Sequence, residues 1–378
     1  MNVLIAIDSF KGSLSTNEAS DAIAEGIGEV SEQFVVKQVP ISDGGEGTFE
    51  ILLHELKGEE IKVRVKDPLF NEITAKYGIL EDGTAILEMA SAAGLPLVED
   101  KLRNPMNTTT YGVGQMIEDA LQKGCRKFII GIGGSATNDG GIGMLRALGF
   151  RFFDHHDKEL NPIGRSLCEI EKIDTNEVNP KLKACEFIIA CDVDNPFYGP
   201  NGAAFVFGKQ KGASEKEIIA LDKGLEHFSN VIKRDLGVDV SSLKGAGAAG
   251  GLGGAFKAFL DAKLEPGTKI IFEKLDVENK IKWADIIITG EGKLDFQTAM
   301  GKAPVGISRL AKKYDKIVIA LSGSLTDDAY ACHDQGITAM FSIINMPMSL
   351  ERAMDKENAK KNMKHSVAEI FRLIKALR

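Results

Sequence analysis

The chain has 378 residues, of which 44% are hydrophobic and 26% are charged, as in ordinary folded globular proteins. This length favours two domains. The 46 basic and 54 acidic side chains give a net charge of −8, so we expect no general affinity for nucleic acid or for an anionic membrane. No apolar run approaches the ~18 residues of a membrane span, and no basic segment precedes the first apolar run. We therefore expect neither a signal peptide nor a membrane anchor, and a cytoplasmic protein.

The N-terminal region alternates between strand and helix patterns. Residues 3–7 and 34–39 are apolar runs of strand length. Between them, Ser15 and Glu18 have the spacing of a capping box at the start of an amphipathic helix. This strand–helix–strand order predicts a parallel βαβ unit.

The middle of the chain has a mixed pattern. Residues 61–90 contain three alternating segments separated by turn signals, which predict antiparallel strands. After them we expect a helix over 113–121, strands at 128–132, 187–190 and 204–207, and a long helix at 216–236.

The last hundred residues return to an alternation of strands and helices that ends in a C-terminal helix. We therefore predict an α/β protein with two α/β domains and the active site in the cleft between them. One domain is doubly wound, Rossmann- or flavodoxin-like and discontinuous, and comprises 1–62, 105–148 and 284–378. The other is a mixed α/β insertion that comprises 63–104 and 149–283.

Five predicted strands end in polar or glycine-rich loops, each with an ionisable residue. These loops are Asp8–Ser13, Ser42–Thr48, Gly131–Gly141, Cys191–Pro196 and Thr289–Asp295. Because the carboxyl ends of parallel strands meet at one edge of a sheet, we expect the loops to form one site. Glycine amides bind phosphate without net positive charge, and carboxylates suit Mg²⁺. This combination predicts phosphoryl transfer.

Other nucleotide-binding patterns are not supported. Gly245–Gly250 matches GxGxxG, but no buried strand precedes it. Gly131–Ala136 follows a strand and matches GxGxxA, but the next residues interrupt the helix that a dinucleotide site requires. The chain contains no GxxxxGK[ST], which excludes a Walker-type phosphate loop.

The ordered motifs DSFKGSLS, DGGEGT, RNPMNTTTYG, GIGGSATNDGG, ACDVDNP, FGKQKGAS, GAGAAGGLGG and ITGEGKLDFQT resemble the bacterial type I glycerate kinase family over nearly the whole chain. This resemblance implies two α/β domains and Mg²⁺-dependent phosphoryl transfer from ATP to glycerate, usually giving 2-phosphoglycerate. The small-molecule partners would be glycerate and ATP. The sequence does not decide whether the chain forms a homo-oligomer. Two alternatives remain: a kinase for another small hydroxy or sugar acid, and a non-catalytic two-domain binding protein.

Roles for individual residues follow from the loops and the resemblance together. We predict that Asp192, directly after a strand, orients or deprotonates the attacking hydroxyl. Asp295 and Glu291 are the predicted Mg²⁺ ligands. The predicted substrate-binding residues are Ser9, Lys11, Ser13, Asp43 and Asn195. The predicted nucleotide-binding residues are Gly133, Gly134, Ser135, Thr137, Asn138 and Lys302.

Overall fold

The computed structural model describes residues 1–42 and 48–377. Its internal contacts divide the chain into two compact units. The terminal unit comprises Met1–Asp43 and Thr268–Arg378, and the inserted unit comprises Gly44–Gly267.

The terminal unit is built on a five-stranded parallel sheet in the order β13–β12–β11–β1–β2. Its strands are β1 (Asn2–Ile5), β2 (Val35–Gln38), β11 (Ile286–Leu294), β12 (Ile317–Leu325) and β13 (Ala339–Ser342). Taken in chain order within this unit, the strands follow the flavodoxin-like order 2-1-3-4-5. The predicted doubly wound fold is therefore confirmed, and the strand order reverses between β1 and β11.

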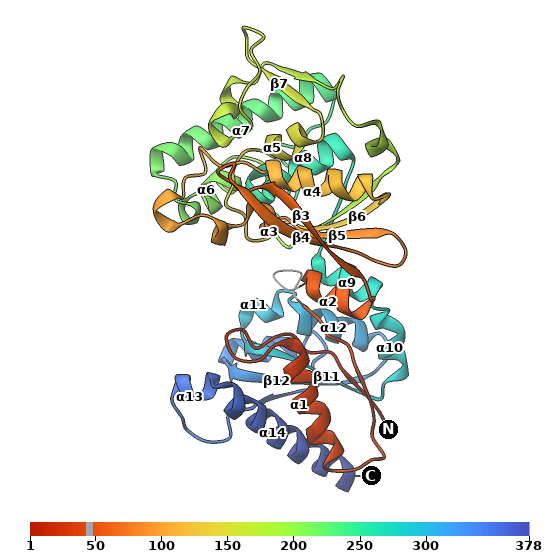
Figure 1. Cartoon of the computed structure of the whole chain (residues 1–378). Coiled ribbons are helices and arrows are strands. Elements are labelled where there is room, and N and C mark those ends of the chain that lie inside the picture. The colour runs from red at the N-terminus through yellow and green to blue at the C-terminus, as the bar shows by residue number, and fades with distance from the viewer. Residues whose placement is uncertain (43–47, 378) are drawn as a thin grey trace. The chain divides into compact units, whose positions relative to one another are not determined.

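Helices cover both faces of this sheet (Figure 1). On one face, α1 (Thr16–Gly28) packs along α14 (Lys356–Ala376); on the other lie α10 (Val277–Trp283) and α12 (Ala303–Lys312). Shorter helices are α9 (Gly267–Lys274), α11 (Phe296–Ala299), α13 (Leu350–Met354) and the 3-10 helix η6 (Asp327–Cys332). Strands whose two faces are both covered are usually continuous apolar runs. The run Val3–Ile7, which contains most of β1, is of this kind and is fully buried.

The start of α1 shows how local sequence sets these elements. Ser15 accepts a hydrogen bond from the Glu18 amide through its Oγ at 3.3 Å, and the Glu18 carboxylate accepts from the Ser15 amide at 3.1 Å. The predicted capping box is thus confirmed.

The inserted unit contains a six-stranded mixed sheet in the order β10–β9–β6–β5–β4–β3. Its strands are β3 (Glu59–Lys66), β4 (Glu72–Ile79), β5 (Thr84–Glu88), β6 (Lys127–Gly131), β9 (Glu186–Ala190) and β10 (Lys263–Glu265). The hairpins β3–β4 and β4–β5 are antiparallel, and β5, β6, β9 and β10 pair in parallel. A separate two-stranded sheet pairs β7 (Arg151–Phe153) with β8 (Lys172–Asp174).

The helices of this unit are α2 (Thr48–Glu55), α3 (Ala90–Ala93), α4 (Tyr111–Gln122), α5 (Ile142–Ala147), α6 (Ala203–Phe207), α7 (Glu215–Leu236) and α8 (Ala248–Leu260). Its 3-10 helices are η1 (Leu95–Leu97), η2 (Asp100–Leu102), η3 (Gly164–Glu169), η4 (Pro180–Ala184) and η5 (Lys209–Lys211). The prediction of a strand at 204–207 is wrong, since these residues form α6. A short apolar run does not by itself distinguish a strand from a helix, and here the preceding Gly202 starts a helix.

Three predictions about the domain bounds are corrected by the contacts and the strand pairing. Residues 48–62, expected in the discontinuous domain, belong to the inserted unit, where β3 pairs with β4. Segment 105–148, expected in the discontinuous domain, belongs to the inserted unit because β6 pairs with β5 and β9. Segment 268–283, expected in the insertion, belongs to the terminal unit, where α10 packs against β1 and α12. A buried parallel strand has the same apolar pattern in either sheet, so its sequence does not select the partner.

The polar loops also divide between the two sheets. The loop after β1 and the segment Thr289–Asp295 at the end of β11 lie at the terminal unit's sheet, whereas the loops that follow β6 and β9 lie at the inserted unit's sheet. Most of the loop Ser42–Thr48 lies outside the described residues. The expectation of a single sheet edge is therefore wrong, because it assumed one parallel sheet where there are two.

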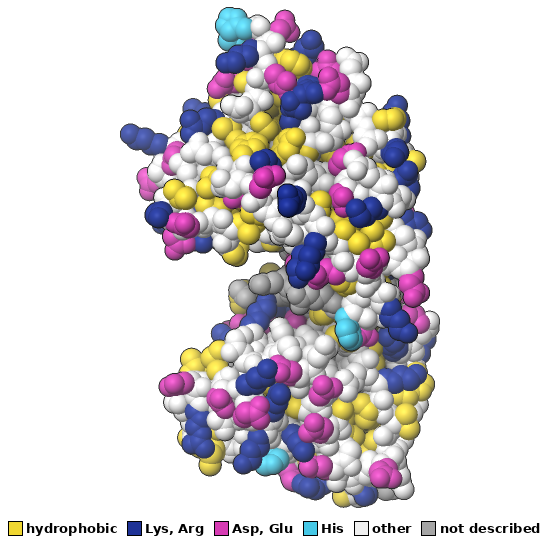
Figure 2. All heavy atoms as spheres, in the orientation of Figure 1, with side chains coloured by type: hydrophobic (Ala, Val, Ile, Leu, Met, Phe, Trp, Pro, Cys, Tyr) yellow, Lys and Arg dark blue, Asp and Glu magenta, His cyan; other side chains and the backbone are white. Residues whose placement is uncertain are grey.

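The surface is mixed in charge. On the face shown in Figure 2, basic and acidic side chains are interspersed over both units. Among residues 1–42 and 48–377, no helix combines the length and the apolar character that crossing a membrane requires.

Candidate active site

A cavity of about 470 Å³ lies in the terminal unit where the strand order reverses. Its polar lining comes from the loop after β1, the ends of β11 and β12, and Lys302 at the start of α12. In doubly wound sheets, ligands bind beyond the carboxyl ends of the strands at such a reversal. The volume falls within the ~300–1,000 Å³ that is usual for small-molecule sites.

The loop after β1 is a tight turn that faces this cavity. Asp8 is buried, and its amide donates to the Gly290 carbonyl at 2.9 Å, which ties the loop to β11. The Asp8 carboxylate accepts from the Ser9 amide at 2.6 Å. Ser9, Lys11 and Ser13 all line the cavity, as the prediction of a common binding loop requires. The Ser13 hydroxyl has no hydrogen-bond partner among the described residues, so it is available to a ligand.

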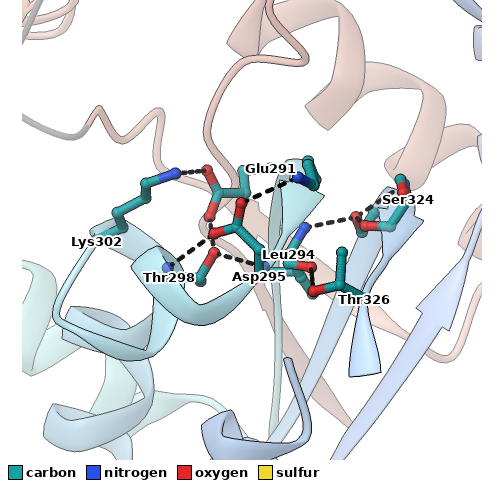
Figure 3. A network of polar contacts seen from close by, with 9 residues as sticks. Glu291, Leu294, Asp295, Thr298, Lys302, Ser324 and Thr326 are labelled. Atoms are coloured by element: carbon teal, nitrogen blue, oxygen red, sulfur yellow. Dashed lines mark hydrogen bonds and ion pairs between the residues drawn. The ribbon is translucent and has the colours of Figure 1, made fainter. Parts of the chain in front are cut away.

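Glu291 and Lys302 form the centre of the polar network in the cavity wall (Figure 3). One Glu291 oxygen accepts from the Thr298 hydroxyl at 2.6 Å, and the other is 3.3 Å from the Lys302 ammonium. Burial raises the pKa of Glu291 above its usual range, and the Thr298 hydroxyl and the Lys302 charge oppose this shift. The negative charge of the nearby Asp295 carboxylate raises the pKa of Glu291 further.

Asp295 follows β11 and is held by its neighbours. Its carboxylate is 3.3 Å from the Lys293 ammonium and accepts from the Thr298 amide at 3.4 Å. The sequence predicted that Glu291 lies in a loop, but β11 continues to Leu294 and stays paired with β12. Gly290 permits this extension, since a Cβ there would be 2.0 Å from the Leu321 carbonyl oxygen at a φ of +153°.

These residues fit a magnesium ion that is shared with a phosphate ligand. Within the described part of the chain, no group of three or more His, Cys, Asp or Glu side chains forms a complete metal site. Mg²⁺, however, is usually bound through one or two carboxylates together with substrate phosphates and water. The interacting pair Glu291 and Asp295 supplies that number of carboxylates. Asp43, the other predicted acidic residue, lies outside the described residues.

In the inserted unit, the glycine-rich loop after β6 is only partly accessible. Gly133 and Gly134 are exposed, whereas Ser135 is buried and forms an isolated antiparallel β-bridge with Gly94. Thr137 and Asn138 are fully buried, and their side-chain polar atoms have no partner among the described residues. Both side chains lie in the interior of the loop, and their assignment to nucleotide phosphates stays a prediction.

Lys211 anchors this loop from inside. Its side chain is 2% exposed, and its Nζ donates to the Ser135 hydroxyl and to the Thr137 carbonyl, both at 2.6 Å. Burial lowers the pKa of Lys211 to about 7, while the charge of Asp139 acts in the opposite direction. A lysine so completely buried is rare unless its donors are satisfied, as two of them are here.

Asp139 holds the other end of the loop. It is fully buried, and its carboxylate accepts from the Thr110 amide at 2.7 Å and the Thr110 hydroxyl at 2.8 Å. Burial raises the pKa of Asp139, and these donors oppose the rise.

Gly250 packs directly on the loop: it has a φ of +70°, and a Cβ there would be 2.1 Å from the Thr137 carbonyl oxygen. The GxGxxG pattern thus serves close packing.

Asp192 lies in the loop after β9, the strand next to β6. It is exposed, and its Oδ1 accepts from the Gly267 amide at 3.0 Å, which orients the carboxylate. Asn195 closes the same loop by donating from Nδ2 to the Asn201 carbonyl at 2.8 Å. An oriented, accessible carboxylate at a strand end is the geometry that a general base requires.

With the geometry established, comparison with known proteins identifies the family. A sequence model described as the glycerate kinase family matches residues 3–375. The chain belongs to the glycerate kinase family. It is therefore a kinase, and the resemblance drawn from the ordered motifs is confirmed.

Members of this family from several bacteria are similar over nearly their whole length. The chain is 46% identical over 354 residues to a protein named glycerate 2-kinase from Escherichia coli, which is 93% of each chain. It is 43% identical to a glycerate kinase from Bacillus subtilis over 99% of this chain and 98% of that one. A crystal structure assigned to a glycerate kinase 2 of Salmonella typhimurium matches 100% of this chain and 98% of its own, with 42% identity and a TM-score of 0.89.

The sequence analysis did not predict a role for two residues that hold the glycine-rich loop after β6 in this member of the glycerate kinase family. Lys211 and Thr110 lie in motifs that carried the resemblance, FGKQKGAS and RNPMNTTTYG, but neither had a predicted role. Their partners, Ser135 and Asp139, are distant in the sequence. Only the motif membership signalled them, since a lysine or threonine in a polar segment is ordinarily a surface residue.

The buried amine predicts a pH-dependent stability. The pKa of Lys211 is about 7 in the folded chain and 10.5 without burial, so between these values the unfolded chain binds more protons. Its contribution to the free energy of unfolding therefore rises with pH, by up to about 1.4 kcal/mol per unit. The free energies of unfolding of the wild type and of Lys211→Met are measured with urea. We expect the wild-type value minus the Lys211→Met value to increase from pH 7 to pH 9.5. The control, Lys209→Met, replaces an exposed lysine of the same turn and should show a constant difference. A constant difference for Lys211→Met as well would contradict the prediction.

Proposed function

We propose that the chain transfers the γ-phosphoryl group of ATP to the C2 hydroxyl of glycerate, giving ADP and 2-phosphoglycerate, with Mg²⁺. The observation that carries this proposal is the cavity at the strand-order reversal, where Glu291, Asp295 and Lys302 meet. Carboxylates for a metal and a lysine for phosphate charge are the components that phosphoryl transfer needs. The name of the Escherichia coli relative, glycerate 2-kinase, supports the C2 position.

In this reaction the glycerate hydroxyl oxygen forms a bond to the γ-phosphorus, and the bond from that phosphorus to the β–γ bridging oxygen breaks. The hydroxyl proton passes to the Asp192 carboxylate, which the Gly267 amide orients. Lys302 and Lys11 would compensate the charge of the phosphates, and the Ser13 hydroxyl would donate to a phosphate oxygen. Ser9 and Asn195 are the proposed glycerate-binding residues of their respective units, and the exposed Gly133 and Gly134 offer amides to an anion.

Glu291 and Asp295 are the proposed metal-holding residues. When bound, Mg²⁺ supplies positive charge that neutralises the β- and γ-phosphate oxygens. The raised pKa of Glu291 fits this role, because a buried carboxylate beside another acid gains from a cation.

The proposal is tested by product analysis. With Mg²⁺ and ATP, we expect ADP formation on addition of D- or L-glycerate, and phosphorus NMR should show phosphate at C2. Parallel assays with other small hydroxy and sugar acids provide the comparison. No ADP above background with either glycerate enantiomer would refute the proposal, and a much higher kcat/KM for another acid would replace the substrate.

The metal assignment predicts how Asp295→Asn responds to magnesium. Because one of two carboxylate ligands is lost, we expect activity to fall most at limiting Mg²⁺ and to recover partly as Mg²⁺ is raised. The apparent activation constant for Mg²⁺ should rise about 10–100-fold, read from initial rates. The control, Asp328→Asn, changes an exposed carboxylate on η6 and should follow the wild type. An equal fractional loss at every Mg²⁺ concentration would show that Asp295 is not a ligand.

The base assignment predicts a different outcome for Asp192→Asn. If the carboxylate acts in the transition state, kcat and kcat/KM should fall together by about 10²-fold with little change in KM. Asp194→Asn is the matched control, because Asp194 lies two residues away and pairs with Lys244 at 3.1 Å on the surface. We expect Asp194→Asn to keep near-normal kcat. Wild-type turnover by Asp192→Asn, measured per folded molecule, would remove it from the mechanism.

A further inference from the structure

The cavity in the terminal unit has a second wall that the polar network does not explain. This part of the lining is apolar and comes from the segment after β13, from α13 and from the first turn of α14: Ile343, Ile344, Leu350, Ala353, Met354 and Ala359. Leu350 is 75% exposed and Met354 is 39% exposed, although both are large apolar side chains. Exposed apolar surface that lines a cavity is typical of a ligand site.

This wall does not suit the acceptor substrate. Glycerate is a three-carbon acid with two hydroxyl groups and offers almost no apolar surface to bury. A cavity of about 470 Å³ lined by both charged and large apolar side chains instead fits a ligand that has a charged part and an apolar part. A nucleoside triphosphate is such a ligand, with charged phosphates at one end and an aromatic base at the other.

The arrangement of the lining residues gives the ligand a direction. Glu291 and Asp295 lie at the end of β11, and Lys302 at the start of α12 pairs with Glu291, so together they can receive phosphates with a metal ion. Met354 packs over the turn after β1, where a Cβ on Gly12 would be 2.8 Å from its Cε. The wall therefore adjoins the phosphate end. A methionine sulfur and a leucine side chain suit the face of an aromatic ring.

We propose that the α13 wall, formed by Ile343, Leu350 and Met354 with their apolar neighbours, binds the base of the phosphoryl donor. This inference rests on the proposed function only in taking ATP as the donor. It places the nucleotide within the terminal unit. In the inserted unit, the glycine-rich loop keeps Thr137 and Asn138 buried and its Ser135 is engaged by Lys211, so that loop offers no side chain to a base.

The test is Leu350→Glu, which places a charge on the wall at an exposed position where the fold should tolerate it. Loss of the apolar contact should raise KM for ATP at least about tenfold while KM for glycerate and kcat change less than about twofold. Direct titration with MgADP, followed by calorimetry in the absence of glycerate, should show the same weakening. The matched control is Met300→Glu: Met300 is 72% exposed and close in sequence to Lys302, but it is not among the cavity-lining residues. It should leave both constants unchanged.

The outcomes separate this inference from the proposed function. If the wild type binds MgADP but phosphorylates no glycerate, the proposed function fails. The comparison of MgADP binding by the wild type and by Leu350→Glu then still tests the role of the α13 wall. The inference is overturned if Leu350→Glu binds MgADP as the wild type does, or if its KM rises for glycerate instead. It is also overturned if the variant changes only the oligomeric state in light scattering, since the wall would then be an interface between copies of the chain.

Discussion

The parallel pairing of β1 with β11 is the interaction on which the rest of this structure depends. It joins Val3–Ile5 to Ile286–Ile288, segments far apart in the sequence, within the terminal unit's sheet. Because β2 lies on one side of β1 and β12 on the far side of β11, the strand order reverses between them. The loop after β1 and the end of β11 both line the cavity at this reversal, and the carboxylates and Lys302 are part of its lining.

The inserted unit leaves this pairing intact. It departs after β2 and returns before α10, the helix that packs against β1 and precedes β11. The crossover therefore keeps the flavodoxin-like order although more than half of the chain lies between its strands. The entropic cost of closing such a long connection grows only slowly with its length. The inserted segment also has a sheet and a hydrophobic core of its own.

The two units stabilise their functional loops by different physical means. In the terminal unit, the carboxylates are largely buried in the cavity wall and interact with lysines there, which suits residues that must bind and release charged ligands. In the inserted unit, the glycine-rich loop is held by buried groups: Lys211 donates to Ser135 and Thr137, and Asp139 accepts from Thr110. Buried polar networks of this kind rigidify a loop when their partners are satisfied, at the cost of removing charge from water.

The amino-acid sequence by itself determined the class of elements, the family and most of the polar residues of the cavity. Apolar periodicity located the strands, the Ser15 capping box located a helix start, and the ordered motifs identified the glycerate kinase family. These signals are local or cumulative, so they survive without knowledge of the fold. Only the tertiary structure decided that β6 joins the inserted sheet, that Glu291 lies in an extended β11, and that Lys211 is buried beneath the glycine loop. Each of these depends on which distant segment packs alongside, because a buried strand or a single lysine has the same sequence pattern whichever partner it meets.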